Sequence, residues 1–338
     1  MQNARLDFSD FRDALFDCAI QPEGVTPDVL RDCPQLQGAS LYNANLQGTS
    51  LNFTQLQGAS LDSALLQGAS LRNTQLQGTT YFSAKLQGAS FESVQLQGAA
   101  FFASELQGVR FFNTKLQGAE LTGAGLNGAS FHYAELQGSA LDQTELQGAS
   151  FSNICVWGAD IRTYGISNIV HVRELELAAE VPPKPGHFRD FCSWRLTMLR
   201  ELHDRMQADI PAGWRRESAL ERIRKNLNPD SPLAAADAMS EGWRALLANR
   251  PHDDDFNRAR ASAWQSAGCA GEGAPYVIRG LLRQFEVPVG PSWQRALAVT
   301  FLDPKTCPAA AKLSDNDKAQ LIQIRGPEPT PAPPAAAR

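Results

Sequence analysis

The chain has 338 residues, enough for two domains, and carries 31 Lys or Arg against 36 Asp or Glu, a net charge of −5. No part of it is strongly basic, so the composition argues against a nucleic-acid partner. The apolar runs fall far short of the roughly 20 residues that a membrane-spanning helix needs, and no signal peptide is recognisable. Six scattered cysteines without metal-like spacing fit a reducing compartment, so we expect a cytoplasmic protein without a membrane span.

The N-terminal residues already follow a period of five. Three units between residues 4 and 18 carry an apolar third residue, namely Leu6, Phe11 and Phe16. Residues 19–33 keep the count of five but lose the pattern. The sequence therefore predicts an N-terminal repeat coil over 1–18 and an inserted loop or short helix over 19–33. Such a coil exposes strand edges at its open end, and a second copy of the chain could cover them, which would give a homodimer.

Residues 34–163 form 26 consecutive units of five without insertion or deletion. The third residue of each unit is Leu, Phe, Tyr, Val or Ile, and the first is nearly always Ala, Thr or Ser. A period of five fits neither an α-helix nor a β-strand, so the chain must turn a corner every five residues and send one large and one small residue inward. The pattern predicts a solenoid whose core is filled by side chains and has no room for a ligand.

These units, with the pattern small-x-Leu/Phe-x-x, resemble the pentapeptide-repeat family. The resemblance implies a right-handed quadrilateral β-helix in which four units make one square coil. Residues 20 apart then stack at about the strand spacing of ~4.8 Å. The resulting inner ladders include two that carry aromatic residues: Tyr81 and Phe101 on one side, and Phe91, Phe111, Phe131 and Phe151 on the opposite side. The fold class expected for the whole chain is this β-solenoid followed by an all-α domain.

A second period, of ten residues, lies over the first. Nearly every other unit ends in Leu-Gln-Gly, which places glycine on two opposite sides of the β-helix. Glycine suits the third position of a type II turn, where φ is positive. The intervening units end in residues such as Asn43, Phe53 and Ser63, so we expect a different turn type at those corners. The glutamines are expected to form two solvated, neutral walls.

Aromatic residues also occupy outward positions, where a β-helix gives them no role in folding. Tyr42, Phe82 and Phe102 share one outward position on one side. On the opposite side the outward residues are Phe53, Phe112, His132 and Tyr133. Clustered exposed apolar groups mark contact surfaces, so these seven residues form the candidate partner surface. In the alternative interpretation, the helical region folds back and covers one of these two aromatic sides.

The five-residue repeat stops at Tyr164. Residues 164–186 are expected to be a cap and linker, 187–325 a helical domain, and 326–338, which are rich in Pro and Ala, a disordered tail. Apolar residues at helical spacing predict helices over 187–208, 213–227, 231–248, 254–267, 274–285, 292–302 and 314–324.

Candidate catalytic groups in the helical region are weak. The glycine-rich stretch 268–273 lacks the Lys and Ser/Thr of a nucleotide-binding loop, so we interpret it as a turn between helices. His187 and Cys192 do not face each other well on one helix and have no orienting third group. No metal-ligand set and no catalytic triad is found, and no cofactor is expected. Cys269 and Cys307 could pair in an oxidising compartment, although free thiols are the commoner state.

Two functions from different classes remain. The first is a non-enzymatic protein–protein interaction scaffold that binds an unknown protein through the outer faces of the β-helix, the helical domain, or both. The second comes from the resemblance, because some pentapeptide-repeat proteins mimic duplex DNA, bind type II topoisomerase and protect it from inhibitors. DNA presents about one charge per 1.7 Å, whereas residues 34–163 carry a net charge of only −3, which argues against mimicry. An enzyme in the helical region is a further alternative, for which no residue suggests a reaction.

Overall fold

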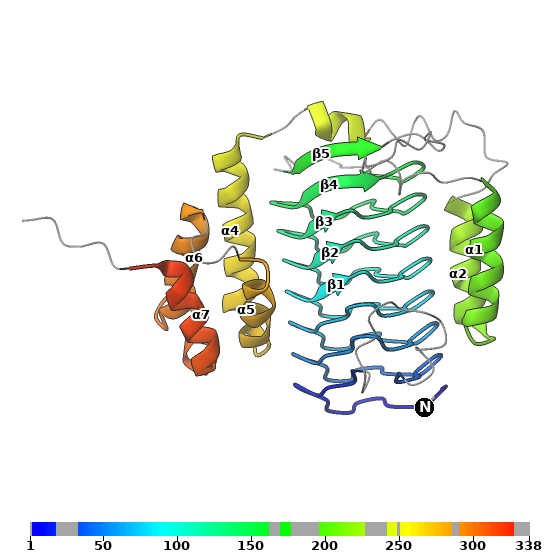
Figure 1. Ribbon diagram of the computed structural model, residues 1–338, viewed down its shortest axis with the longest axis horizontal. Helices are drawn as coiled ribbons and strands as arrows, with labels where there is room; N and C mark the ends of the chain where they lie inside the picture. The colour runs from blue at the N-terminus through cyan, green and yellow to red at the C-terminus, as the bar shows by residue number, and fades with distance from the viewer. Residues whose placement is uncertain are drawn as a thin grey trace, which may run out of the picture.

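The computed structural model describes residues 2–17, 33–161, 170–176, 196–226, 242–248, 251–285 and 291–327. The repeats wind into a parallel β-helix whose coils stack along one axis. Helices α1 and α2 lie along one flank of the β-helix, and α4 to α7 lie along the opposite flank (Figure 1). The expected fold class, a β-solenoid followed by an all-α region, is confirmed.

Each coil takes 20 residues and has four sides. Parallel bridges join, for example, Ser40 to Ser60 and Gln55 to Gln75. We name the sides by their inner ladders. Side A runs from Leu36 to Val156, side B from Leu41 to Ile161, side C from Leu46 to Leu146, and side D from Leu51 to Phe151.

Regular strands occur on side D. They are β1 (Ser90–Glu92), β2 (Arg110–Phe112), β3 (Ser130–His132), β4 (Ser150–Cys155) and β5 (His171–Glu176), in the order β1-β2-β3-β4-β5. Strand β5 lies beyond the last repeat and pairs with β4, with Phe151 opposite Val172. The region expected as cap and linker thus contains a strand that sequence analysis missed, because the five-residue pattern has ended there. Residues 164–169 and 177–186 of that region lie outside the described residues.

The N-terminal residues form a coil below the first full repeat coil. Arg5 pairs with Ser40, Asp10 with Asn45, and Leu15 with Ser50, all in parallel. This interval of 35 residues exceeds one 20-residue coil by 15, the length of the segment 19–33. The loop or short helix expected there lies outside the described residues, apart from Cys33.

All four kinds of corner place their fifth residue in the left-handed region. The φ angle is 66° at Gly38 and 53° at Asn43. On sides A and B the closing hydrogen bond is also the same, because Ala39 N donates to Leu36 O and Ala44 N donates to Leu41 O, each at 3.0 Å. The prediction of a different turn at the non-glycine corners is therefore wrong at these positions. Positive φ alone does not explain why glycine occupies sides A and C.

The inner ladders are buried as predicted. On side D, Phe111 stacks on Phe131 with ring centroids 4.6 Å apart, and Phe131 stacks on Phe151 at 4.7 Å. On side B, Tyr81 stacks on Phe101 at 4.5 Å. Such stacking adds roughly 0.5–1.5 kcal/mol per pair beyond burial.

The helices match the predicted segments closely. They are α1 (Leu196–Asp209), α2 (Trp214–Asn226), α4 (Asp253–Cys269), α5 (Ala274–Leu282), α6 (Ser292–Leu302), the 3₁₀ helix η3 (Pro308–Lys312) and α7 (Asp315–Arg325). Residues 242–248 are also helical, and Trp243 there closes the end of the β-helix core by packing edge-on against Phe151. The remaining parts of the helices predicted over 187–208 and 231–248 lie outside the described residues. So do His187, Cys192 and the tail from residue 328.

The helical layer formed by α4 to α7 has its own core. Trp264, Leu281 and Phe301 are buried in it, and the disulfide Cys269–Cys307 joins the end of α4 to the start of η3. Cys33 and Cys155 each form a disulfide as well, but not with each other. The four cysteines in the described part of the chain are thus all oxidised, which contradicts the expectation of free thiols and is typical of an oxidising compartment.

Candidate functional site

The helices cover the two glycine sides of the β-helix. Helices α1 and α2 pack on side A, and α4 and α5 pack on side C. A Cβ atom at Gly118 would lie 2.6 Å from Ile223 Cδ1, and one at Gly68 would overlap the carbonyl oxygen of Tyr276. The Leu-Gln-Gly period therefore provides the close approach that the helices need. The described helices leave the aromatic residues of side B exposed, and α4 to α6 border side D along the row Arg110, Ser130 and Ser150.

Side chains of the helices hydrogen-bond to the corner carbonyls of these two sides. Arg222 donates to Gly98 O through Nε at 3.0 Å and Nη2 at 2.6 Å. Trp264 Nε1 donates to Gly128 O at 2.9 Å. Burial lowers the pKa of Arg222. These donors satisfy carbonyl oxygens that would otherwise be shielded from water without a partner.

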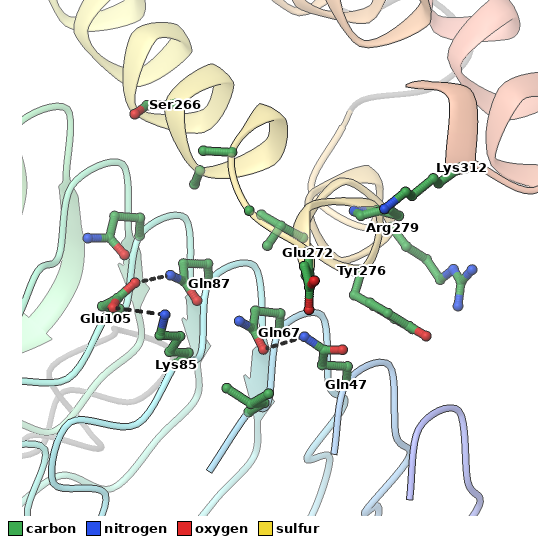
Figure 2. A pocket seen from close by; sticks show the side chains of 18 of the residues that line it. Gln47, Gln67, Lys85, Gln87, Glu105, Ser266, Glu272, Tyr276, Arg279 and Lys312 are labelled. Carbon is green, nitrogen blue, oxygen red and sulfur yellow. Dashed lines mark hydrogen bonds and ion pairs between the residues drawn. The ribbon is translucent and has the colours of Figure 1, made fainter. Parts of the chain in front are cut away.

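The glutamine wall of side A is buried, whereas that of side C is buried at Gln47 and Gln67 and half-buried at Gln87, Gln107 and Gln147. Gln117 and Gln137 are each 1 % exposed, because the helices lie over them. Within the wall of side C, Gln47 Nε2 donates to Gln67 Oε1 of the next coil at 3.2 Å (Figure 2). The prediction of solvated walls is wrong for side A, because α1 and α2 cover it. There Gln37 Nε2 donates to Gln55 Oε1 of the next coil and Gln77 Nε2 to Gln95 Oε1, each at 2.8 Å, while the buried Oε1 atoms of Gln37 and Gln77 have no partner among the described residues.

A polar cavity of about 990 Å³ lies between side C and the turn into α5 (Figure 2). Its charges are mixed, since Lys85 Nζ lies 3.8 Å from Glu105 Oε1, and Glu272 and Arg279 face it from the helical layer. The glycine-rich stretch 268–273 reaches this wall, and a Cβ at Gly273 would lie 2.7 Å from Gln47 Nε2. Close packing therefore accounts for that glycine, in keeping with the interpretation as a turn between helices.

Side B is open and exposes aromatic residues. Tyr42 is 43 % exposed, Phe82 40 % and Phe102 46 %. The rings of Phe82 and Phe102 lie 5.9 Å apart, and the exposed Phe8 of the N-terminal coil contacts Tyr42 edge-on at 5.7 Å. Sequence analysis missed Phe8, although Phe8 is the fifth residue of the unit that contains Leu6 and therefore lies at a corner.

The outward positions of side B are also acidic. Among the described residues of side B, the acidic ones are Asp7, Asp62, Glu120, Asp142 and Asp160, and the basic one is Arg5. Asp62 Oδ1 accepts a hydrogen bond from Phe82 N at 2.9 Å, so the carboxylate lies beside the aromatic pair. The surface is therefore apolar at its centre and negatively charged around it.

Side D brings together three of its four candidate residues. The Phe112 ring stacks on His132 at 5.5 Å and contacts Tyr133 edge-on at 5.9 Å. Phe53 does not join them. Phe53 is only 7 % exposed and packs with Cys33, so its prediction as part of the candidate partner surface is wrong.

The geometry defines a four-sided parallel β-helix with five residues per side, flanked by helices. The repeat region belongs to the pentapeptide-repeat family, whose model, described as pentapeptide repeats in eight copies, matches residues 35–62, 104–141 and 126–162. No curated protein matches the sequence.

Solved structures of pentapeptide-repeat proteins are similar to the β-helix. HetL from the cyanobacterium Nostoc sp. strain PCC 7120, involved in heterocyst differentiation regulation, is 20 % identical and aligns over 52 % of this chain and 86 % of its own, with a TM-score of 0.34. Full-length QnrB1, a plasmid-mediated fluoroquinolone resistance protein, is 14 % identical over 53 % of this chain and 93 % of its own, with a TM-score of 0.31. These scores are low, and no function is transferred from them. In the part of the chain that the structure describes, every helix is too short or too polar to cross a membrane.

Proposed function

We propose that the chain is a non-enzymatic protein-binding scaffold and that side B is its contact surface. The observation that carries the proposal is the distribution of helices: they bury sides A and C and leave side B open with Phe8, Tyr42, Phe82 and Phe102 exposed. Exposed aromatic residues contribute little to folding, and at interfaces they supply most of the binding energy.

The partner that fits side B is a protein with an apolar patch bordered by basic residues. The acids around Phe82 and Phe102 would meet those basic residues and accelerate association. The DNA-mimic alternative is not favoured, because Tyr42, Phe82 and Phe102 interrupt the acidic positions along the axis. The disulfide-bonded cysteines support an oxidising compartment as the place of action, in place of the cytoplasm.

Affinity capture with the full chain tests this proposal. The baits are the wild type, the side B variant Phe82→Ser/Phe102→Ser, and the control Val299→Ser/Ile322→Ser, which removes two exposed apolar residues of α6 and α7. We expect a protein that the wild type and the control recover and the side B variant loses. If every bait recovers the same proteins, side B is not the contact surface.

A further inference from the structure

A second cavity, of about 530 Å³, lies between side D and helices α4 to α6. Its β-helix wall is the row Arg110, Ser130 and Ser150, which the pairing of β2, β3 and β4 holds in register. Arg260 of α4 faces this row, and Nη2 of Arg260 donates to Ser150 Oγ at 2.6 Å. Arg283, at the end of α5, and Trp293 of α6 line the cavity from the helical layer.

The lining is positively charged. It contains three arginines, and none of its described residues is Asp or Glu. Arg260 lies over the rings of Phe256 and Trp264 at 5.0 and 5.6 Å, and its Nε is buried and has no hydrogen-bond partner among the described residues. Arg110 lies 4.9 Å over the ring of Phe112, and Arg283 donates to a backbone carbonyl. The ion pairs between described residues include none of these three arginines. The carboxylate of Asp317 favours the charged form of Arg283, whereas burial alone acts on the charge of Arg260.

Such a cluster is costly in the absence of an anion. Burial lowers the pKa of Arg260 to about 10 and also lowers the pKa of Arg283, because desolvation disfavours the charged forms. A bound anion would offset this cost. Guanidinium groups match the geometry of phosphate oxygens with two parallel hydrogen bonds.

We propose that this cavity binds the phosphate group of a small phosphomonoester or of free inorganic phosphate. Arg110 and Arg260 hold the phosphate oxygens, and Trp293 provides a wall for a group attached to the phosphate. The site is on side D and does not depend on the binding surface proposed for side B.

Titration calorimetry of the full, oxidised chain at low ionic strength tests the site with inorganic phosphate, phenyl phosphate and acetate. We expect phosphate to bind and acetate to bind at least about tenfold more weakly. Arg110→Gln should weaken phosphate binding about tenfold or more, because hydrogen bonds to charged groups are lost. The matched control is Arg72→Gln, which removes the same charge from the same side at a residue paired with Glu92 at 2.9 Å outside the cavity. It should leave the affinity within about twofold.

The outcomes separate the sources of the ligand. Tighter binding of phenyl phosphate than of inorganic phosphate supports the site and assigns it to an organic phosphate, and equal binding supports it and assigns it to free phosphate. If Arg110→Gln does not reach the wild-type thermal midpoint, Arg110→Lys takes its place, since it keeps the charge but loses the paired donors. The proposal is overturned if the wild type binds no phosphate, if acetate binds as tightly, or if Arg72→Gln weakens binding as much as the change at Arg110.

Discussion

Glycine occupies corners of the β-helix for two different physical reasons, positive φ and the close approach of a helix. Gly68 on side C and Gly123 on side B have nearly the same φ, 67° and 68°. A Cβ atom at Gly123 would meet nothing within 4 Å, whereas one at Gly68 would overlap the backbone of Tyr276 in α5. Corners such as Asn43 show that the left-handed conformation alone tolerates a side chain. Glycine therefore recurs every ten residues because the helices pack on those sides. Sequence analysis explained the glycines by turn conformation alone and did not predict this packing.

This pair of glycines allows backbone strain to be separated from helix contact. Gly123→Ala should lower the free energy of unfolding by about 1–2 kcal/mol, the usual cost of a left-handed conformation. Gly68→Ala should cost about 1–3 kcal/mol more, because α5 must move away from side C. Denaturant unfolding of both variants measures the difference. Equal losses would mean that α5 does not pack on Gly68.

At the scale of elements, local signals predicted the helices and missed the last strand. Ser314 and Asp317 form a capping box at the start of α7, and three acids occupy the first turn of α4, so local sequence signals of helix starts coincide with the observed ones. The ends of α6 coincide with the predicted 292–302. Strand β5 was missed because it forms by pairing with β4, and the five-residue pattern does not predict such a long-range contact.

The Cys269–Cys307 disulfide should stabilise the helical layer. It closes a sequence separation of 38 residues between α4 and η3, and the constraint on the unfolded chain is worth about 2–4 kcal/mol. Cys269→Ala/Cys307→Ala should lower the free energy of unfolding of this layer by that amount. Denaturation followed by tryptophan fluorescence, with Trp264 in the core of the layer, measures the loss. An unchanged midpoint and slope would show that the pair is not oxidised in the folded protein.

At the scale of the whole molecule, the β-helix lies between two helical flanks (Figure 1). The described helices leave side B open, whereas α4 to α6 also line a cavity along side D. The repeat followed from the sequence, and its four ladders and their stacking followed from the resemblance to the pentapeptide-repeat family. The placement of the helices did not follow, since glutamine walls look solvated when they are considered alone. In the folded chain most of these glutamines lie under the helices, and amides such as those of Gln37 and Gln47 donate to a glutamine of the next coil. The cavity of three arginines was likewise not predictable, because Arg110, Arg260 and Arg283 come together only through this packing.

Cysteine labelling tests most directly whether the helices cover sides A and C and leave side B free. Single cysteines replace Gln97 on side A, Gln67 on side C and Ser83 on side B, and a maleimide reports their accessibility in the native, oxidised protein. Gln97 and Gln67 are buried under helices, and Ser83 is exposed. We predict rapid labelling of Ser83→Cys and labelling of the other two at least about 100-fold slower, through transient opening. Equal rates at the three positions would contradict the arrangement and, with it, the assignment of side B as the free binding surface.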